Sequence, residues 1–378
     1  MSATPPAFEA LRAWFVDQAV PLWSRYGVDR RYGGFFERLD PNLIPTAEPR
    51  RARLVARQIY TFCIAESFGW QGPADELINH GFHFLSRHLL NPQGVVCASC
   101  TAAGQLLDSR QYLYDVAFVL LALAKQFKRQ PDCSASEDLA RRIVMRLSLN
   151  PVGGYIELSS PGLQCANPHM HLFEAFLTWT IVSDCEDGFW MQRAGSLAEL
   201  ATEHMVQPHH GLIPEHYEQS WRPVRHGGNF RIEPGHQFEW SWLLATWASI
   251  TGDTRASAAA SHLCRVAEEH GVDPIRDVAF ESIDNSLAPV DCTARLWQQT
   301  ERIKAWHQQA QLDGLSTSIR HRDQALDSLL RFLCGPRAGL WFDEMDASGN
   351  FVSLPVKASS GYHIACAIEV IFNRFSCH

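Results

Sequence analysis

The apolar residues of this 378-residue chain recur at helical spacing in long stretches, which are separated by short turns that usually contain glycine. Apolar positions that return every three or four residues predict helices with one buried face. The pattern predicts twelve helices, over residues 8–23, 51–70, 74–90, 112–127, 136–150, 167–183, 190–206, 234–250, 254–271, 292–310, 322–335 and 360–375. Between pairs of helices lie a glycine, two or three apolar residues and polar turn residues, which predict a short strand and a turn.

These turn segments form a repeat with six copies, of which the fifth is the weakest. Their anchors lie at successive spacings of 61, 59, 58, 67 and 61 residues and are Gly33, Gly94, Gly153, Gly211, Val278 and Gly339. Two predicted helices follow each of the first five anchors, one follows the sixth, and the first helix of each pair is the more apolar. Because a helix that is apolar all round has to be buried, we expect the first helices to form an inner ring and the second helices an outer ring.

The repeat therefore predicts an all-α fold, an (α/α)6 barrel or toroid with short β-hairpins at the cavity mouth. We expect a single catalytic domain over residues 1–378, because no extended linker interrupts the repeat. A solenoid with free ends is the alternative. The toroid is favoured because the helix predicted over residues 8–23 supplies the missing partner of the helix over 360–375.

Composition and charge narrow the class of protein without identifying it. The chain is 46% hydrophobic and 20% charged, and its net charge of −8 comes from interspersed charges of both signs, as in many globular proteins. No basic stripe, no run of 18 apolar residues and no signal-peptide pattern occurs, so we expect no nucleic-acid partner, no membrane and a cytoplasmic location. Eleven scattered cysteines favour reduced thiols, and the CxxC at Cys97 and Cys100 has no second pair for zinc.

Polar side chains gather where the inner helices are expected to begin. Buried polar groups cost about 1–3 kcal/mol each unless they are paired, so a collection of them at one end of a barrel indicates a functional site. In the stretch EPGHQFEW, His236 lies at a helix start, and Glu239 is on the same face, where its carboxylate can support a protonated imidazole. His169 and His171 are two residues apart and point to different helix faces, so only one of them is expected to reach the cavity.

Several of these residues have a second interpretation. His236 and Glu239 could belong to a metal site, but no HExxH motif, carboxylate cluster or second metal motif is present, so we expect no metal. No Walker, dinucleotide-binding or GxSxG motif occurs, so we expect no cofactor. Arg57 either anchors an anion or pairs with a structural carboxylate, Trp297 is either core or a sugar platform, and Met170 has the character of a packing residue.

Five segments carry a resemblance to a known family: RLVARQIYTF, YDVAFVLLALA, NPHMHLFEAFL, EPGHQFEWSWLL and RLWQQTERIKA. With them, nearly the whole chain resembles the N-acylglucosamine 2-epimerase superfamily, which includes cellobiose 2-epimerase, D-mannose isomerase and related aldose–ketose isomerases. The resemblance implies the same barrel, catalytic histidines at His236 and His363, an enediolate-binding arginine at Arg57, and Glu239 as the carboxylate that supports the first histidine. It also implies substrate contacts from Tyr114, Asn167, Met170, His171, Trp297 and Glu301.

The reaction implied is proton transfer by histidine through an enediolate at C1 and C2 of an open-chain aldose, most simply isomerisation of the mannose–fructose type. N-acylglucosamine 2-epimerase or cellobiose 2-epimerase activity is an alternative. A glycoside hydrolase that uses two of Glu174, Glu239 and Glu301, or a non-catalytic sugar-binding protein, would be a different class. We expect a small sugar as the substrate, with a homodimer as one option for the assembly.

Two departures from the family pattern concern the substrate. Arg53 stands where some isomerases have an aromatic site residue, and the segment VKASSGYH that leads to His363 differs from the commonest patterns. We interpret Arg50, Arg51 and Arg53 as a solvated helix start. The alternative is that this group of cations suits an anionic sugar.

Overall fold

The computed structural model describes residues 6–131, 134–159, 162–183, 185–225 and 227–372. The chain divides into two compact units. Unit 1 consists of Met1–Ser148, Leu333–Asp343 and Ser353–Glu369, and unit 2 consists of Leu149–Phe332, Glu344–Val352 and Val370–His378. The described part of both units is mostly helical, as the hydrophobic pattern predicts.

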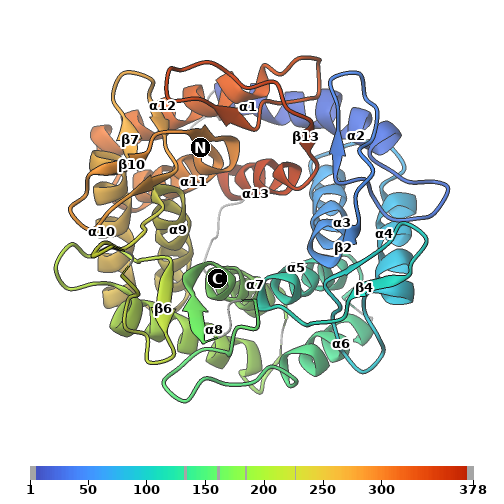
Figure 1. Ribbon diagram of the computed structural model, residues 1–378, viewed down its shortest axis with the longest axis horizontal. Helices are drawn as coiled ribbons and strands as arrows, with labels where there is room; N and C mark the ends of the chain where they lie inside the picture. Colours follow the sequence, from blue (N-terminus) through green and yellow to red (C-terminus); the bar gives the residue numbers. More distant parts are fainter. Residues whose placement is uncertain (1–5, 132–133, 160–161, 184, 226, 373–378) are drawn as a thin grey trace. The chain divides into compact units, whose positions relative to one another are not determined.

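Unit 1 arranges its helices in two layers (Figure 1). One layer holds α3 (Ala52–Ser67), α5 (Leu113–Arg129) and α13 (Ser360–Phe372). The other holds α1 (Pro6–Trp14), the π-helical turn η1 (Phe15–Ala19), α2 (Val20–Tyr26), α4 (Ala74–His88) and α6 (Ala135–Val144). Residues 54–65 of α3 are all buried, whereas the buried residues of α4 recur every three or four positions. Helix α3, the first of this pair, is therefore enclosed, and α4, the second, has one solvent-exposed face, as the sequence predicts.

Unit 2 repeats this two-layer arrangement (Figure 1). Its enclosed helices are α7 (Ala166–Val182), α9 (Pro234–Thr251) and α11 (Leu296–Asp313). Its second layer holds α8 (Phe189–Leu200), the π-helical turn η2 (Ala201–Met205), α10 (Thr254–Gly271) and α12 (Ser316–Leu333). Residues 234–247 of α9 are buried without a break. The side chains of its first turn therefore face protein or an internal space.

The first and last parts of the chain pack together within unit 1. Strand β13 (Val356–Lys357) pairs with β1 (Arg38–Leu39) in antiparallel register. The ring of Trp341 stacks on Trp23 with 5.1 Å between centroids and meets Trp14 edge-on at 6.3 Å. These contacts place the N-terminal helices against the segment that precedes α13 within unit 1, as expected if the helix over residues 8–23 is the partner of the last helix.

Short strands precede several enclosed helices, but most of them do not form the simple hairpins that the sequence suggested. The pairs are β2 (Arg50–Arg51) with β3 (Ser99–Cys100), β5 (Leu163–Cys165) with β6 (His216–Glu218), and β11 (Ala294–Arg295) with β12 (Glu344–Met345). In each, the segment that leads into one helix pairs with the turn segment of the next copy. Hairpins within one copy are β3 with β4 (Leu106–Asp108), β7 (Val272–Asp273) with β8 (Val278–Ala279), and β9 (Ser282–Ile283) with β10 (Pro289–Asp291).

The repeat anchors adopt a left-handed backbone. Gly94 has φ of 86°, and a Cβ added there would lie 3.0 Å from the backbone nitrogen of Ile143, so only glycine fits. In the fifth copy the left-handed residue is Asp277, with φ of 51°, and not Val278 as expected. A β-branched valine is strongly disfavoured in this region, whereas aspartate tolerates it and here accepts a hydrogen bond from Arg302 at 2.9 Å.

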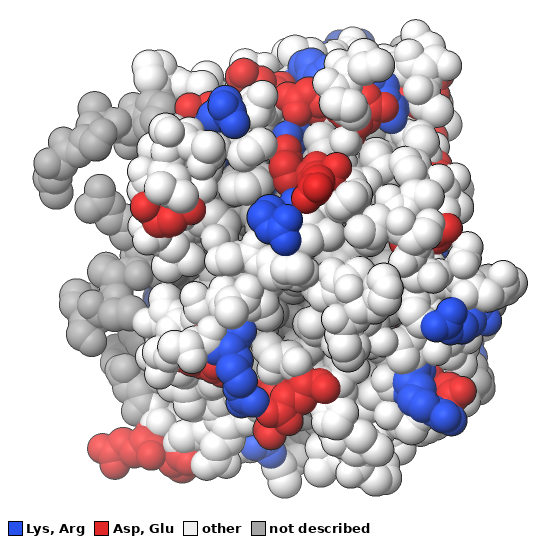
Figure 2. Space-filling view, turned by 90° about the vertical axis from the view of Figure 1, so that its left-hand side faces the viewer, with Lys and Arg blue, Asp and Glu red and all other residues white. Residues whose placement is uncertain are grey.

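The surface and the cysteines add little chemistry. Figure 2 shows acidic and basic side chains interspersed on the face that it displays, without a basic band. None of the described helices combines the length and the apolarity that a membrane span requires. The described cysteines are all free thiols, including Cys97 and Cys100, while Cys133 and Cys377 lie outside the described residues.

Candidate active site

Arg57 lies in the second turn of α3, and its guanidinium is enclosed by aromatic rings. It is 6% exposed, and its Nη2 donates to the hydroxyl of Tyr114 at 2.7 Å. The guanidinium carbon lies 3.9 Å from the ring centre of Phe118 and 5.4 Å from that of Tyr362. No described carboxylate lies within 4.0 Å of this guanidinium, and its Nε has no hydrogen-bond partner among the described residues. Arg57 is therefore a buried cation whose charge is left uncompensated at close range.

The arginines at the start of α3 are arranged differently. Arg50 is 3% exposed, and its Nη2 lies 2.7 Å from a carboxylate oxygen of Asp29. Arg51 donates two hydrogen bonds to the carboxylate of Glu37, at 2.8 and 3.0 Å. The interpretation as a solvated helix start is thus wrong for Arg50, which is buried. Burial opposes a free charge, and a carboxylate from the first repeat copy compensates each of these cations.

Arg53 is also paired. The carboxylate of Asp115 on α5 lies 3.3 Å from Nη1 of Arg53 and accepts the backbone N–H of the same residue at 3.1 Å. Burial raises the pKa of Asp115 to about 6, although Arg53 and Arg57 both act to lower it. Asp115 thus lies between a paired arginine and the uncompensated Arg57.

His363 lies in the first turn of α13, in the same unit as Arg57. It is 8% exposed, and its ring centre is 5.2 Å from that of Tyr362, the tyrosine that also flanks Arg57. The amide of Gln58 donates to the carbonyl of Ala358, just before α13, at 2.9 Å. This bond ties the second turn of α3, where Arg57 lies, to the start of the helix that carries His363. The structure therefore brings Arg57, Tyr114 and His363 into one neighbourhood of unit 1.

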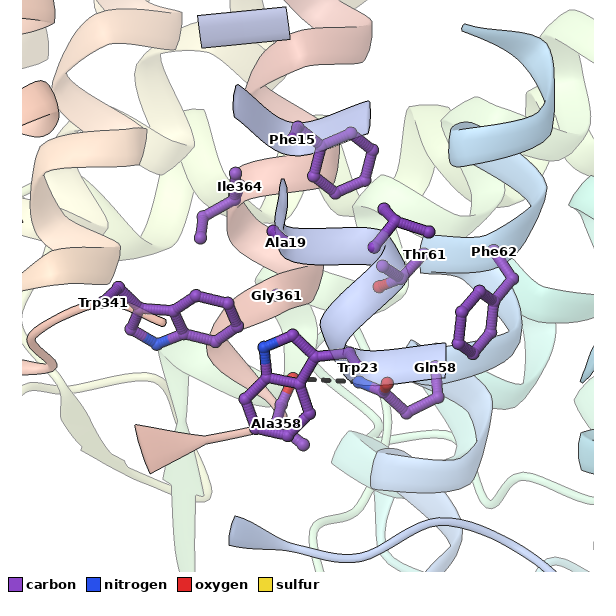
Figure 3. Close-up of a pocket in the computed structure, with 11 residues that line it drawn as sticks. Phe15, Ala19, Trp23, Gln58, Thr61, Phe62, Trp341, Ala358, Gly361 and Ile364 are labelled. Atoms are coloured by element: carbon purple, nitrogen blue, oxygen red, sulfur yellow. Dashed lines mark hydrogen bonds between the residues drawn. The ribbon is translucent and has the colours of Figure 1, made fainter. Parts of the chain in front are cut away.

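A small apolar cavity lies behind this neighbourhood. Figure 3 shows its lining from three parts of unit 1, with Gln58 and Thr61 on α3, Gly361 on α13, and the indoles of Trp23 and Trp341. Its volume is about 10 Å³, which is room for roughly one water molecule. The cavity is too small for a sugar, so it belongs to the packing that supports α3 and α13.

In unit 2, His236 lies in the first turn of α9, where it meets two carboxylates. Its Nδ1 is 2.9 Å from Oε2 of Glu215 and 3.5 Å from Oε2 of Glu233. Burial by itself would lower the pKa of His236, but Glu215 and Glu233 raise it to about 10. The ring centre lies 4.9 Å from that of Trp297 on α11. At neutral pH this histidine is a buried imidazolium.

The carboxylate that supports His236 is therefore not the expected one. Glu239 follows His236 by three residues, yet its Oε1 lies 3.5 Å from Nδ1 of His171 on α7. Nδ1 of His171 also lies 3.1 Å from Glu174. Burial raises the pKa of Glu239 well above its usual value, and the neighbouring Glu301 adds to the rise. Glu239 contributes to the field at His236, but Glu215 makes the hydrogen bond.

Glu301 belongs to a second buried pair in unit 2. Its Oε2 lies 2.6 Å from Nζ of Lys304 and accepts the indole N–H of Trp242 at 3.1 Å. Both members of the ion pair are fully buried. Trp242 therefore has a structural partner for its N–H.

The remaining expected substrate contacts lie on α7. Met170 is fully buried, which suits its character as a packing residue, and a sugar contact from it stays a prediction. Asn167 begins the same helix, and its Oδ1 is buried without a hydrogen-bond partner among the described residues. His169 bonds to the backbone of Tyr155 and Cys165, so the two neighbouring histidines do point to different partners, as the sequence predicts.

Sequence reasoning missed Glu215 and Glu233, although a signal for Glu215 was present. In five of the six repeat copies, a carboxylate stands four residues after the left-handed anchor, namely Glu37, Glu157, Glu215, Glu281 and Asp343. Several of them bond to a residue at the start of an enclosed helix: Glu37 to Arg51, Glu215 to His236, and Glu281 to Arg295 and Gln298. The repeat therefore encodes an acid that faces the helix starts.

Comparisons with known proteins identify the family and the fold. Residues 34–367 match the family described as N-acylglucosamine 2-epimerase. A Rhizobium meliloti protein named mannose-6-phosphate isomerase is 36% identical over 367 residues, which is 95% of each chain. A cellobiose 2-epimerase from Bacteroides fragilis is 21% identical over 88% of this chain and 89% of its own length. A crystal structure of D-mannose isomerase has a TM-score of 0.87 at 17% identity and covers 98% of this chain and 99% of that one, which shows a shared fold.

The chain therefore shares its helical fold with a solved D-mannose isomerase and buries many ionisable groups. The chain belongs to the N-acylglucosamine 2-epimerase family. It is a carbohydrate isomerase or epimerase.

Proposed function

We propose that this protein isomerises an open-chain aldose to the corresponding ketose by proton transfer between C1 and C2, with mannose and fructose as the pair. We further propose that the six helix pairs close into an (α/α)6 toroid, with His236, His363 and Arg57 facing its cavity. The observation that carries the reaction is the contrast between two buried cations. Glu215 and Glu233 keep His236 protonated. Arg57, in contrast, forms no ion pair with a carboxylate among the described residues.

His236 supplies the acid of the reaction. A histidine whose pKa is about 10 holds its proton at neutral pH, so it can donate to the ring oxygen when the sugar opens and recover a proton from the hydroxyl on C1. It then carries a proton between the C2 and C1 oxygens. Glu215 keeps the ring oriented through Nδ1, which leaves the other ring nitrogen for the substrate.

His363 supplies the base that acts at carbon. A neutral imidazole takes the proton from C2 and returns the same proton to C1, while His236 moves a proton from the oxygen on C2 to the oxygen on C1. The sum is an isomerisation without net gain or loss of protons. Arg57 stabilises the negative charge that develops on the enediolate oxygens, because a guanidinium in a water-poor site acts far more strongly than in solution.

The protonated state of His236 favours isomerisation over 2-epimerisation. Epimerisation in both directions needs a group on each face of C2 that can remove a proton as well as deliver one. An imidazolium that two carboxylates keep charged can deliver a proton but is a poor base. Epimerase activity on a cellobiose or N-acylglucosamine substrate is therefore the second candidate.

The ion pairs of unit 1 favour a neutral sugar over a phosphorylated one. The arginines at the start of α3 are already paired, Arg50 with Asp29, Arg51 with Glu37 and Arg53 with Asp115. A phosphate would have to displace a carboxylate from one of them. We expect kcat/KM for mannose to exceed that for mannose 6-phosphate by about 10²-fold, although the relative from Rhizobium meliloti carries the name of the phosphate enzyme.

The direct test is NMR in deuterated water with mannose, mannose 6-phosphate, glucose, N-acetylmannosamine and cellobiose. We expect fructose from mannose, with partial deuterium at C1, because a proton held by histidine exchanges with solvent. Mannose that returns as glucose without passing through fructose would instead establish epimerisation. A product with no label at C1 or C2 under any condition would contradict a proton shuttle open to solvent.

Two variants complete this test. His236→Asn and His363→Asn should each lower kcat by at least about 10³-fold while the folded state persists by circular dichroism. Substantial turnover in either variant would reject the assignment. Release of a reducing end from a disaccharide would point to a glycoside hydrolase, and sugar binding without turnover across the panel would point to a binding protein.

A further inference from the structure

Gln237, the residue after His236, is fully buried, and both ends of its amide bond to a single backbone residue. Its Oε1 accepts the N–H of Ile213 at 2.9 Å, and its Nε2 donates to the carbonyl of Ile213 at 2.9 Å. Nε2 also lies 3.2 Å from the carbonyl of Glu233, four residues earlier. A glutamine that is satisfied in this way fixes the distance between the first turn of α9 and the turn segment that contains Ile213.

The same clamp occurs on α11. Oε1 of Gln299 accepts the N–H of Ala279 at 2.9 Å, and its Nε2 donates to the carbonyl of Ala279 at 2.8 Å and to that of Arg295, four residues earlier, at 3.0 Å. Ala279, like Ile213, stands two residues after the left-handed anchor of its repeat copy. The clamp is therefore a recurring part of the repeat.

On α7 a histidine takes the place of the glutamine. Nε2 of His169 lies 3.0 Å from both the nitrogen and the carbonyl oxygen of Tyr155, and Nδ1 lies 2.9 Å from the carbonyl of Cys165, again four residues earlier. Burial lowers the pKa of His169 to about 4, so the ring is neutral and offers one donor and one acceptor. Because the carbonyl of Cys165 can only accept, Nδ1 donates to it and Nε2 accepts the N–H of Tyr155, so the neutral histidine replaces two of the three hydrogen bonds of the glutamine clamp.

The clamp on α9 differs from the other two in what it holds in place. Two residues beyond Ile213 in the turn segment lies Glu215, and one residue before Gln237 lies His236. These two neighbours form the 2.9 Å contact between Oε2 and Nδ1. The backbone of Glu215 is itself fixed, because its N–H donates to Arg231 and its carbonyl accepts from Ala166. The clamp, together with these backbone bonds, therefore sets the position of the Glu215 carboxylate relative to the His236 ring.

We propose that Gln237 is a positioning residue for the catalytic pair, and that its clamp on Ile213 holds the carboxylate of Glu215 in hydrogen-bond reach of His236. This proposal rests on the function proposed above for His236, but its principal readout does not need turnover. Three acidic groups face the imidazole, Glu215 from the turn segment and Glu233 and Glu239 from α9 or its start. Glu215 depends on the clamp through Ile213, whereas Glu233 receives from Gln237 only the 3.2 Å bond to its backbone carbonyl.

The experiment is an NMR titration of the His236 ring in the ligand-free full chain, combined with the pH dependence of kcat. Gln237→Met keeps the length of the side chain and removes all three hydrogen bonds of the amide. We expect the pKa of His236 to fall by about one unit or more, because Glu215 is no longer held at Nδ1, and kcat to fall about 10²-fold. Gln299→Met removes the same clamp from α11 and is the matched control, with the titration of His236 unchanged.

Gln237→His is the rescue variant, because His169 on α7 keeps the bond from the backbone N–H of the turn segment and the bond to the carbonyl four residues earlier. It should restore the titration of His236 to that of the unaltered protein. If Gln237→Met does not fold, Gln237→Asn gives the same readout, since its amide is one methylene too short to make both bonds. An unchanged titration in the folded Met or Asn variant would overturn the proposal and leave Gln237 with a structural role like that of Gln299. A changed titration in a protein without isomerase activity would uphold the clamp and reject the proposed function alone.

Discussion

The two units each bury a cation at the start of an enclosed helix, and they treat its charge in opposite ways. Arg57 in unit 1 is surrounded by aromatic rings and has no carboxylate within 4.0 Å among the described residues. His236 in unit 2 has two carboxylates within that distance, Glu215 and Glu233. A guanidinium stays charged without help because its pKa lies above about 12, whereas a buried imidazole becomes neutral unless carboxylates hold its proton. Carboxylates therefore surround His236, which needs them to stay protonated. They are absent near the guanidinium of Arg57 among the described residues, which leaves its charge for the proposed contact with the enediolate.

Other buried cations of the described chain pair with a carboxylate, unlike Arg57. Lys125 in unit 1 pairs with Glu369, and in unit 2 Arg302 pairs with Glu268 and Lys304 with Glu301. In each, the carboxylate offsets the cost of burying the cation. Aromatic faces stabilise a desolvated cation by about 2 kcal/mol or more, which compensates its burial less than a carboxylate does. The charge of Arg57 therefore suits the anion of the proposed reaction.

The largest effect is expected from Arg57 itself. Arg57→Met removes the charge and keeps the bulk, and we expect kcat to fall by about 10³-fold through loss of enediolate stabilisation, with little change in the midpoint of thermal unfolding. The measurement is steady-state kinetics with mannose. Arg53→Met is the matched control and should change kcat by less than about tenfold, because Arg53 is neutralised by Asp115. Equal losses in the two variants would break the comparison between paired and unpaired arginines.

A smaller effect is expected from Glu215→Gln, which removes one of the two acids at His236. The pKa of His236 lies near 10, above its ordinary value of 6.5, so the ion pair stabilises the fold most fully below pH 6.5, and this contribution is lost as pH rises through 10. In the Glu215→Gln variant, the imidazolium loses its proton at lower pH. We expect kcat to fall about 10²-fold at pH 9 and less at pH 6. A drop of equal size at both pH values would show that Glu215 does not act through the proton on His236.

The smallest effect is expected from Phe118→Leu, which removes the ring 3.9 Å from the guanidinium of Arg57. The charge remains, but the cation–π contact and the rigid wall are lost, so we expect kcat/KM to fall about tenfold. Phe173→Leu, on α7 of unit 2 and stacked on Trp240, is a suitable control for the general cost of removing a buried ring. If the two variants lose the same activity, the aromatic enclosure of Arg57 has no special role.

Much of the fold could be predicted because the signal is periodic. A repeat of about 60 residues fixes six helix pairs, and continuous burial along α3 and α9 matches the more apolar helix of each pair. The fifth copy was weak because Asp277 replaces the usual glycine. Strand pairing could not be predicted, since two-residue strands such as β2 and β11 have no periodicity and their partners lie in the next copy.

The sequence by itself determined which helices are enclosed and which residues stand at their starts, because helical spacing and composition are local properties. Only the tertiary structure decided which acid meets which base. Glu239 shares a helix with His236 but lies beside His171 from another helix, and the partner of His236 is Glu215, 21 residues earlier in a turn segment. Side chains three residues apart lie on the same side of a helix, but contacts with other elements can still draw them to different partners, so packing between elements selects the pair.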